Sequence, residues 1–319
     1  MVIDEELKKR KEIVEDALKE FVREGEPIEL YEASKHLLNA GGKRLRPVTV
    51  LLSSELVGGD AEAAIHAAIS VELLHNFTLI HDDIMDEDEL RRGIPTVHSI
   101  WGIPYAILAG DTLHALSFHL LSRSQAPAER IVRAVEVLSR ACVEICEGQW
   151  MDMEFEKRTD VSEEEYLKMV AKKTGALYEA SAVLGGIMGG GSDEQIKALG
   201  EFGRNIGIGF QIYDDILDIT AKDEEIGKDR GSDIAEGKKT LLVIKAQELG
   251  VRLPEVRKRD ERSVEEALRV LESSGVMNYA RKKAREYVER GKKALEIFPE
   301  NHAKRILLQL ADFMIERSY

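Results

Sequence analysis

Cysteine is scarce in this sequence, and a secretion signal is missing. The 319 residues include two cysteines, Cys142 and Cys146, four positions apart with no histidine or further cysteine beside them. Such a pair predicts buried thiols, and neither a disulfide framework nor a zinc site. The first ten residues, MVIDEELKKR, have no signal-peptide pattern. We therefore expect a cytoplasmic protein.

Basic residues are fewer than acidic ones, and long apolar runs are also scarce. The formal net charge is −14, which argues against a general nucleic-acid binder. It does not exclude an anionic substrate, because metal ions and a local basic cluster can reverse the sign of the potential inside a cleft. The uncharged run 93–110 is interrupted by two prolines and a glycine, so it predicts core, and no transmembrane segment is expected.

Strand patterns and linkers are missing as well. Alternating β-branched runs bounded by hairpin turns do not occur, and no linker rich in Gly, Ser or Pro divides the chain. Helical periodicity covers almost the whole sequence, so we expect one all-α domain over residues 1–319. Residues 96–110 are expected to be irregular. The predicted helices are 4–24, 28–40, 48–57, 61–89, 111–122, 127–156 and one that begins near residue 193.

The most informative stretch closes a long, alanine-rich apolar run. Asp82 and Asp86 are four residues apart, about one helical turn, so their carboxylates share a face, and Asp83 adjoins them. Like charges at this spacing destabilise a bare helix, so a positive group should offset them, and a hard cation with oxygen ligands is the natural candidate. Arg91 and Arg92 follow closely. This order of acid and base indicates a metal that holds a phosphate, with the arginines clamping it.

The same acidic spacing recurs later in the chain. Asp214, Asp215 and Asp218 end another apolar run. One such motif would fit a solvated acidic helix end as well as it fits a metal site. Two DDxxD turns at the ends of two apolar helices are hard to explain as solvated surface residues. Facing each other, they would form a mouth for several divalent ions.

On these motifs and the arginine pair, the sequence resembles the trans-isoprenyl diphosphate synthases, which are head-to-tail prenyltransferases, and most closely the archaeal geranylgeranyl type. The resemblance covers residues 40–240. It implies a helical bundle around a deep central cavity, and a homodimer. It also implies Mg²⁺ as cofactor, about three ions per active site, with Mn²⁺ as the alternative. The implied reaction condenses isopentenyl diphosphate with an allylic diphosphate.

The resemblance assigns two sets of diphosphate-binding residues. A GGKRLRP loop, which alone would be an ordinary basic loop, carries Lys43 and Arg46 of the isopentenyl diphosphate set, with Arg44 left open. His75 and Arg92 complete that set. A lysine pair at 172–173 could also be surface lysines with extended side chains. The implied allylic diphosphate set is Arg91, Lys173, Thr174, Gln211, Lys228 and Lys238.

The resemblance also implies which residues bind metal and which are catalytic. We expect a mobile loop over the mouth at residues 227–240. The segment 147–152, EGQWMD, is similar to a family GQxxD sequence, and we expect it to have a structural or supporting role. The implied metal ligands are Asp82, Asp86 and Asp214, supported by Asp83, Asp215 and Asp218. The expected catalytic residues are Asp82, Asp86, Lys173, Asp214 and Lys238.

Phe77 is the candidate for setting product length. It precedes Asp82 by five residues, about 7.5 Å along a helix axis. A prenyl chain anchored by its diphosphate at the aspartates would extend along this helix, and a ring there would stop its growth, although Phe77 would also suit the core. In the family such positions, here Phe77 with Thr78 and Leu74, set chain length. We expect geranylgeranyl diphosphate, with a farnesyl or longer product as the alternative.

Two other functions share parts of this pattern. A class I terpene cyclase has the first motif, but usually carries an Asn/Asp, Ser/Thr, Glu triad in place of the second and lacks the basic loop. A non-catalytic subunit of a heteromeric synthase tends to lose aspartates, whereas all six are present here. We therefore predict an active synthase.

Overall fold

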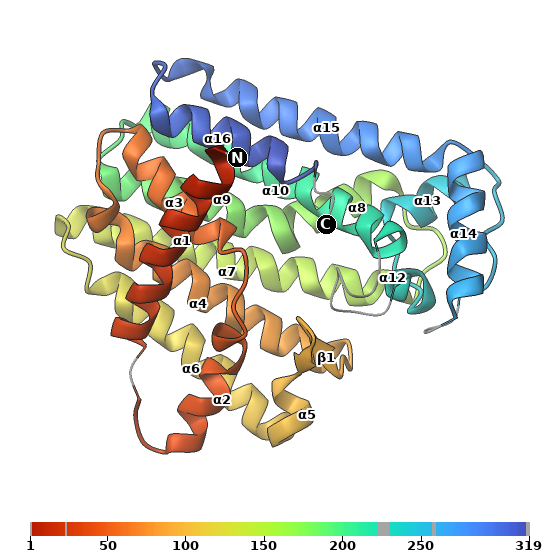
Figure 1. The fold of residues 1–319 in the computed structure, drawn as a ribbon, viewed down its shortest axis with the longest axis horizontal. Helices are drawn as coiled ribbons and strands as arrows, with labels where there is room; N and C mark the ends of the chain where they lie inside the picture. The colour runs from red at the N-terminus through yellow and green to blue at the C-terminus, as the bar shows by residue number, and fades with distance from the viewer. Residues whose placement is uncertain (1, 23, 222–229, 257–259, 317–319) are drawn as a thin grey trace.

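The part of the chain that the structure describes is a bundle of helices with one very short hairpin (Figure 1). The computed structural model describes residues 2–22, 24–221, 230–256 and 260–316. This architecture confirms the predicted all-α fold. The elements are α1 (Val2–Phe21), α2 (Ile28–Asn39), α3 (Leu45–Leu56), α4 (Ala61–Met85), β1 (Leu90–Arg91), β2 (Ile94–Pro95), α5 (Val97–Trp101), α6 (Ile103–Ser122), α7 (Ala128–Glu156), α8 (Glu163–Val170), the π-helix η1 (Ala171–Gly175), α9 (Ala176–Gly189), α10 (Asp193–Thr220), α12 (Ser232–Ala235), α13 (Leu241–Glu248), α14 (Glu261–Ser273), α15 (Val276–Ala294), the 3₁₀ helix η2 (Leu295–Ile297) and α16 (His302–Phe313).

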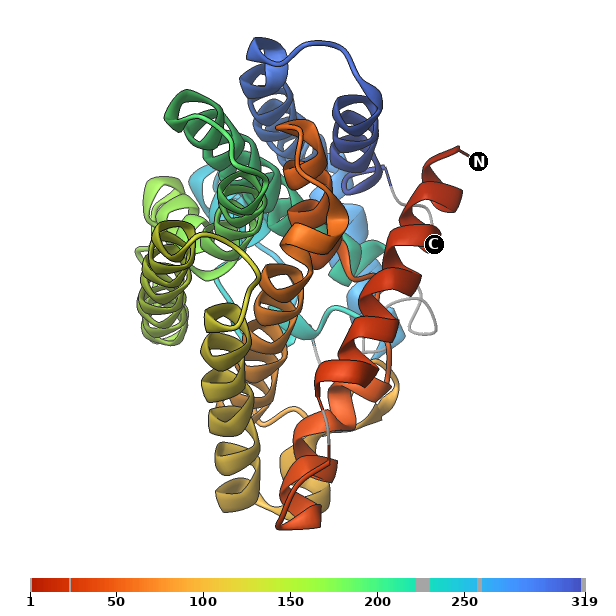
Figure 2. The same ribbon diagram turned by 90° about the vertical axis from the view of Figure 1, so that its left-hand side faces the viewer.

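Two groups of buried apolar side chains fill the bundle, and α3 and α9 contribute to both. One group joins them mainly to α8, α10 and the helices from α13 to α16, and the other to α1, α2, α4, α6 and α7. Figure 1 shows α15 running along α10, and Figure 2 shows α1 on the outside of the bundle, where it contacts α3 and α4. The central helices α3, α4, α9 and α10 are thereby fixed on several sides.

Helix α4 carries the first acidic motif at its C-terminal end. Asp60 caps its N-terminus, and the Asp60 side chain accepts a hydrogen bond from the backbone N–H of Ala63 at 2.7 Å. Its early core positions are small, including the fully buried Ala64, Ala67 and Ala68, which allow neighbouring helices to approach closely. By length and composition α4 could cross a membrane, but 61% of its apolar window is buried inside the fold, as in a core helix.

Helix α10 carries the second acidic motif, and glycine sets its distance from α9. Ser192 and Gln195 form a capping box that starts the helix. A Cβ atom at Gly203 would lie 2.8 Å from the Cα atom of Glu179 and would collide with the carbonyl oxygen of Tyr178. The backbones of α9 and α10 therefore touch, which offsets the low helix propensity of glycine and places Asp214 beside the cavity described below.

One prediction of burial and two of secondary structure were wrong. Cys146, which was expected to be a buried thiol, is exposed. Residues 96–110 are mostly helical, because Gly102 has a φ of 88° that ends α5, and Pro104 stands in the first turn of α6, where no backbone N–H is needed. A hairpin also occurs where no strand was predicted. Arg92 and Gly93, with φ of 54° and 76°, turn the chain between β1 and β2, whose two-residue lengths leave no alternating pattern to detect.

Candidate active site

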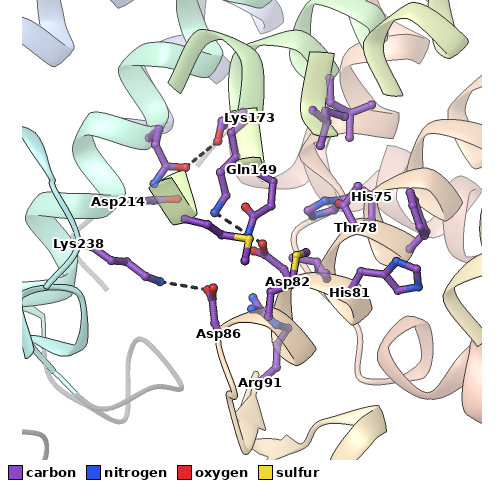
Figure 3. Close-up of a pocket in the computed structure, with 18 of the residues that line it drawn as sticks. His75, Thr78, His81, Asp82, Asp86, Arg91, Gln149, Lys173, Asp214 and Lys238 are labelled. Carbon is purple, nitrogen blue, oxygen red and sulfur yellow. Dashed lines mark hydrogen bonds and ion pairs between the residues drawn. The ribbon is translucent and has the colours of Figure 1, made fainter. Parts of the chain in front are cut away.

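A cavity of about 580 Å³ lies between α4, α7, η1 and α10. Acidic and basic side chains, most of them labelled in Figure 3, line one end. A second basic cluster lines another part, and the remaining wall is largely apolar. We call the charged end the mouth and define it by the residues Asp82, Asp86, Lys173, Asp214 and Lys238. The apolar part of the wall includes Phe77, Met85, Ile145, Leu177 and Leu217.

The three aspartates of the first motif point in different directions. Asp82 and Asp86 line the cavity, whereas Asp83 is fully buried and forms an ion pair with Arg91. Arg91 also approaches Asp88, at 3.6 Å, and lines the cavity itself. Asp83 thus orients the arginine, and only the outer two aspartates present their carboxylates to the cavity among the described residues of this motif.

Lys173 faces the first of these carboxylates. It belongs to η1, and its Nζ lies 2.7 Å from Oδ2 of Asp152 and 3.6 Å from Oδ1 of Asp82. Burial alone would lower the pKa of Lys173, but the carboxylates of Asp82 and Asp152 outweigh it and raise the pKa above its usual value. The lysine therefore remains charged at the mouth.

Lys238 faces the second carboxylate. Its Nζ lies 3.1 Å from Oδ2 of Asp86, 3.3 Å from Glu236 and 3.7 Å from Asp233. Burial would lower the pKa of Lys238, but these carboxylates raise it well above its usual value. This contact ties the segment after α12 to the end of α4 across 152 positions of sequence.

The aspartates of the second motif also differ in what they contact. Asp214 lines the cavity, whereas Asp215 is buried and accepts hydrogen bonds from the Tyr166 hydroxyl at 2.6 Å and from Nε2 of Gln211 at 2.9 Å. Oε1 of Gln211 in turn accepts a hydrogen bond from the Thr174 hydroxyl at 2.8 Å. Burial and the nearby Asp233 raise the pKa of Asp215 to about 8. This chain of bonds fixes η1 against α10.

Asp218 holds the segment that contains α12. It accepts hydrogen bonds from the Ser232 hydroxyl at 2.9 Å and from the backbone N–H of Asp233 at 3.3 Å. Burial and the carboxylate of Asp233 raise its pKa well above the usual value. Lys228, which was predicted to bind the allylic diphosphate, lies outside the described residues.

A second basic cluster lies on another part of the cavity wall. Nη1 of Arg46 is 3.2 Å from Nε2 of His75, and its guanidinium stacks 4.3 Å from the ring centroid of Tyr178. Arg92 donates to the carbonyl oxygens of Leu37, at 3.1 Å, and Gly41, and also lines the cavity. Burial and then the charges of Arg46 and Arg92 hold the pKa of His75 well below its usual range, so this histidine is neutral.

The remaining residues of the basic loop have different surroundings. Lys43 is exposed and is not part of the described cavity lining. Arg44, whose role was left open, is 3% exposed and bonds Glu72, Oε1 of Glu15 at 2.9 Å and the carbonyl oxygen of Leu38 at 2.7 Å. Its cation is therefore committed to the protein core and is not directed at the cavity.

The predicted chain-length residues are only partly in the cavity wall. Phe77 and Thr78 line it, and the Phe77 ring packs against the rings of His81 and His114, with centroids 4.8 Å and 5.0 Å away. Leu74 is fully buried and is not among the described lining residues. Phe77 is thus braced by two rings on its own side of the cavity.

Several contacts in the site could not be assigned from the sequence. Asp152 belongs to the segment 147–152 that was singled out, but its ion pair with Lys173 was not foreseen. Gln149 of the same segment lines the cavity. Tyr166 had no sequence signal, because its bond to Asp215 joins residues 49 positions apart.

The carboxylates suit a metal only together with another ligand. The described residues contain no group of three or more His, Cys, Asp or Glu side chains that could hold a metal ion. Asp82, Asp86 and Asp214 nevertheless share one cavity, and Mg²⁺ is usually bound by one or two carboxylates plus waters and substrate phosphates. The ammonium groups beside Asp82 and Asp86 indicate that both positions favour a cation. These residues fit divalent ions whose coordination a diphosphate completes.

Comparison with known proteins identifies the family. The polyprenyl synthetase family model matches residues 27–273. The chain belongs to this family. It is 54% identical over 320 residues to the geranylgeranyl pyrophosphate synthase of Geoglobus acetivorans, and the match covers 100% of both chains. It is 50% identical over 322 residues to the geranylgeranyl diphosphate synthase of Methanosarcina mazei, and that match covers 100% of this chain and 99% of the relative.

A solved structure gives the same result. The Geoglobus acetivorans enzyme superposes with a TM-score of 0.92 at 53% identity, over 98% of this chain and 99% of that one. The predictions of a prenyltransferase of this family and of an all-α bundle are therefore confirmed. In this chain the two acidic motifs lie at the C-terminal ends of two long helices, α4 and α10, that border one cavity.

The different surroundings of Lys43 and Arg44 can be tested by unfolding. Arg44→Met leaves the carboxylate of Glu72, which is 2% exposed, without its cation. We expect a loss of about 3–5 kcal/mol in the free energy of unfolding, measured in urea. The adjacent Lys43→Met, at an exposed position, is the matched control and should change it by less than about 0.5 kcal/mol. Equal effects of the two substitutions would refute the structural assignment of Arg44.

Proposed function

We propose that this polyprenyl synthetase condenses isopentenyl diphosphate with allylic diphosphates, head to tail, and releases geranylgeranyl diphosphate. Two separate groups of cationic side chains line the same cavity, and this observation supports the proposal. Lys173 and Lys238 belong to one, and Arg46 and Arg92 belong to the other. A cyclase needs a site for one diphosphate, whereas joining two diphosphate substrates needs two.

The metal ions of this proposal would be held by Asp82, Asp86 and Asp214. About three Mg²⁺ ions, or Mn²⁺ in their place, would neutralise charge on the departing diphosphate when they are bound. Asp83, Asp215 and Asp218 support the site indirectly in this proposal, since they contact Arg91, Tyr166, Gln211, Ser232 and Asp233.

The protein's own groups bind and orient both substrates. Lys173 and Lys238, which are already charged and already beside carboxylates, exchange these partners for the allylic diphosphate with little reorganisation. Arg91, Thr174, Gln211 and Lys228 complete that set in this proposal. Neutral His75 gives a hydrogen bond beside the charges of Arg46 and Arg92 at the isopentenyl diphosphate, and Lys43 would join them from the loop.

The apolar wall protects the reaction. The transferred chain carries a positive charge on its allylic carbons once the diphosphate has left, and water would capture it. Phe77, Met85, Ile145, Leu177 and Leu217 provide an apolar surface that excludes water. The departing diphosphate is the base nearest to the proton that the isopentenyl unit then loses, and Phe77 ends the space available to the growing chain.

We infer that the enzyme is a homodimer in which the chain folds as one domain. Several large apolar side chains on α6 and α7 are exposed: Tyr105 is 63% exposed, Leu108 54%, Val143 58% and Trp150 74%. An interface needs roughly 800 Å² per partner, and exposed apolar side chains of this size are suited to such a surface. The cytoplasmic location remains a prediction.

The proposed chemistry is tested first through Asp82. We expect the protein to condense labelled isopentenyl diphosphate with farnesyl diphosphate in the presence of Mg²⁺. Asp82→Ala should lower kcat/KM by about 100-fold or more, because a metal ligand and the partner of Lys173 are lost together. Asp16→Ala, which changes an exposed carboxylate on α1, is the control and should be fully active. Full activity of Asp82→Ala would remove the metal assignment.

The product length is tested through Phe77. Phe77→Ala opens the apolar wall beyond the mouth, so chains longer than twenty carbons should appear when the products are separated by chromatography. Phe21→Ala, an aromatic truncation on α1 that does not touch the described cavity lining, should leave the product unchanged. An unchanged product from Phe77→Ala would mean that the end of the cavity is set elsewhere.

A further inference from the structure

Gln149 is a buried polar side chain to which the proposed function gives no role. It is 8% exposed and lines the cavity from α7. Neither its Oε1 nor its Nε2 has a hydrogen-bond partner within the described part of the chain. Buried amides are normally satisfied, because an unpartnered one is unfavourable. A molecule in the cavity is therefore the natural partner for this side chain.

The surroundings of Gln149 set it apart from the rest of α7. The other α7 residues in the described lining, Ile145, Cys146, Trp150 and Met153, present mainly apolar or sulfur-containing side chains. Three positions after Gln149, Asp152 turns to the ammonium group of Lys173. Gln149 thus stands where the wall changes from apolar to charged, which is where the allylic chain must join its diphosphate.

Gly148 fixes how closely this part of α7 approaches η1. A Cβ atom at Gly148 would lie 2.7 Å from the Cα atom of Lys173 and would collide with the Lys173 backbone nitrogen. The two helices are therefore in backbone contact at this point. Figure 3 shows the Gln149 side chain among the residues that line the cavity, drawn between those of Lys173 and Asp82 in this view.

We propose that the amide of Gln149 binds the allylic substrate at the bond that breaks. This inference rests on the proposed function. The bond between C1 of the allylic chain and the diphosphate oxygen breaks, and its electron pair leaves with the diphosphate. The π electrons of isopentenyl diphosphate form the new carbon–carbon bond to C1, and the departed diphosphate then accepts the proton that the isopentenyl unit loses. Gln149 directs its carbonyl oxygen to the charged allylic carbons and its N–H groups to the departing oxygen.

A neutral amide is suited to this position. A carboxylate would repel the incoming diphosphate or capture the allylic cation as an ester, and an ammonium group would repel the cation. The amide supplies an acceptor and two donors without net charge. Because the contact at Gly148 holds its backbone, the amide dipole is oriented before the reaction begins, and a preorganised dipole stabilises developing charge most effectively.

The test is Gln149→Met, which keeps the length of the side chain and removes its polar atoms. With an unpartnered amide gone, the thermal midpoint of the ligand-free protein should stay the same or rise. With farnesyl diphosphate and isopentenyl diphosphate as substrates, kcat should fall about tenfold or more. The KM for isopentenyl diphosphate and the product length should not change, since neither depends on the breaking bond.

Controls separate this inference from its alternatives. Gln309→Met, at an exposed position on α16, should alter neither kcat nor the midpoint. A Gln149→Met enzyme with wild-type kcat would overturn the inference and leave Gln149 a plain core residue. If Gln149→Met does not fold, Gln149→Asn, which withdraws the amide by one carbon, should show the same loss of kcat, and wild-type kcat would again overturn it. An inactive wild-type protein would instead contradict the proposed function.

Discussion

The opposition of carboxylates and lysines at the mouth is the interaction on which the rest of this structure depends. Asp82 lies 3.6 Å from Lys173, and Asp86 lies 3.1 Å from Lys238. Neither pair could be assembled locally, because the partners come from α4, η1 and the segment after α12. Four charges beside an apolar cavity are stable only if each is compensated. The same compensation leaves the lysines charged and available to an anionic substrate.

Close helix packing is what brings these charges together. Gly148 allows backbone contact between α7 and η1, and Gly203 allows it between α9 and α10. The hydrogen bonds from Thr174 through Gln211 and Asp215 then fix η1 against α10. Rigid packing around the mouth means that substrate charge meets groups already in place, which is the arrangement that electrostatic stabilisation requires.

The sequence was a good guide to helices and to the acidic motifs, because both depend on local spacing. The positions of Asp82, Asp86 and Asp214 follow from a repeat of four residues on apolar helices. What could not be predicted depends on contacts distant in sequence. Arg44 belongs to the same basic loop as Arg46 but turns to Glu72 in the core. The start of α6 was missed because its early proline and glycine suggested an irregular segment.

In the proposed function, the metal site is completed by substrate and is not preformed by the carboxylates. Calorimetric titration of Mg²⁺ into the protein, with and without a non-reactive allylic thiolodiphosphate, tests this most directly. We predict a dissociation constant of about 1 mM or weaker for Mg²⁺ alone, and binding at least about tenfold tighter with the analogue. Micromolar binding of Mg²⁺ to the ligand-free protein, unchanged by the analogue, would mean that the carboxylates form the metal site without substrate.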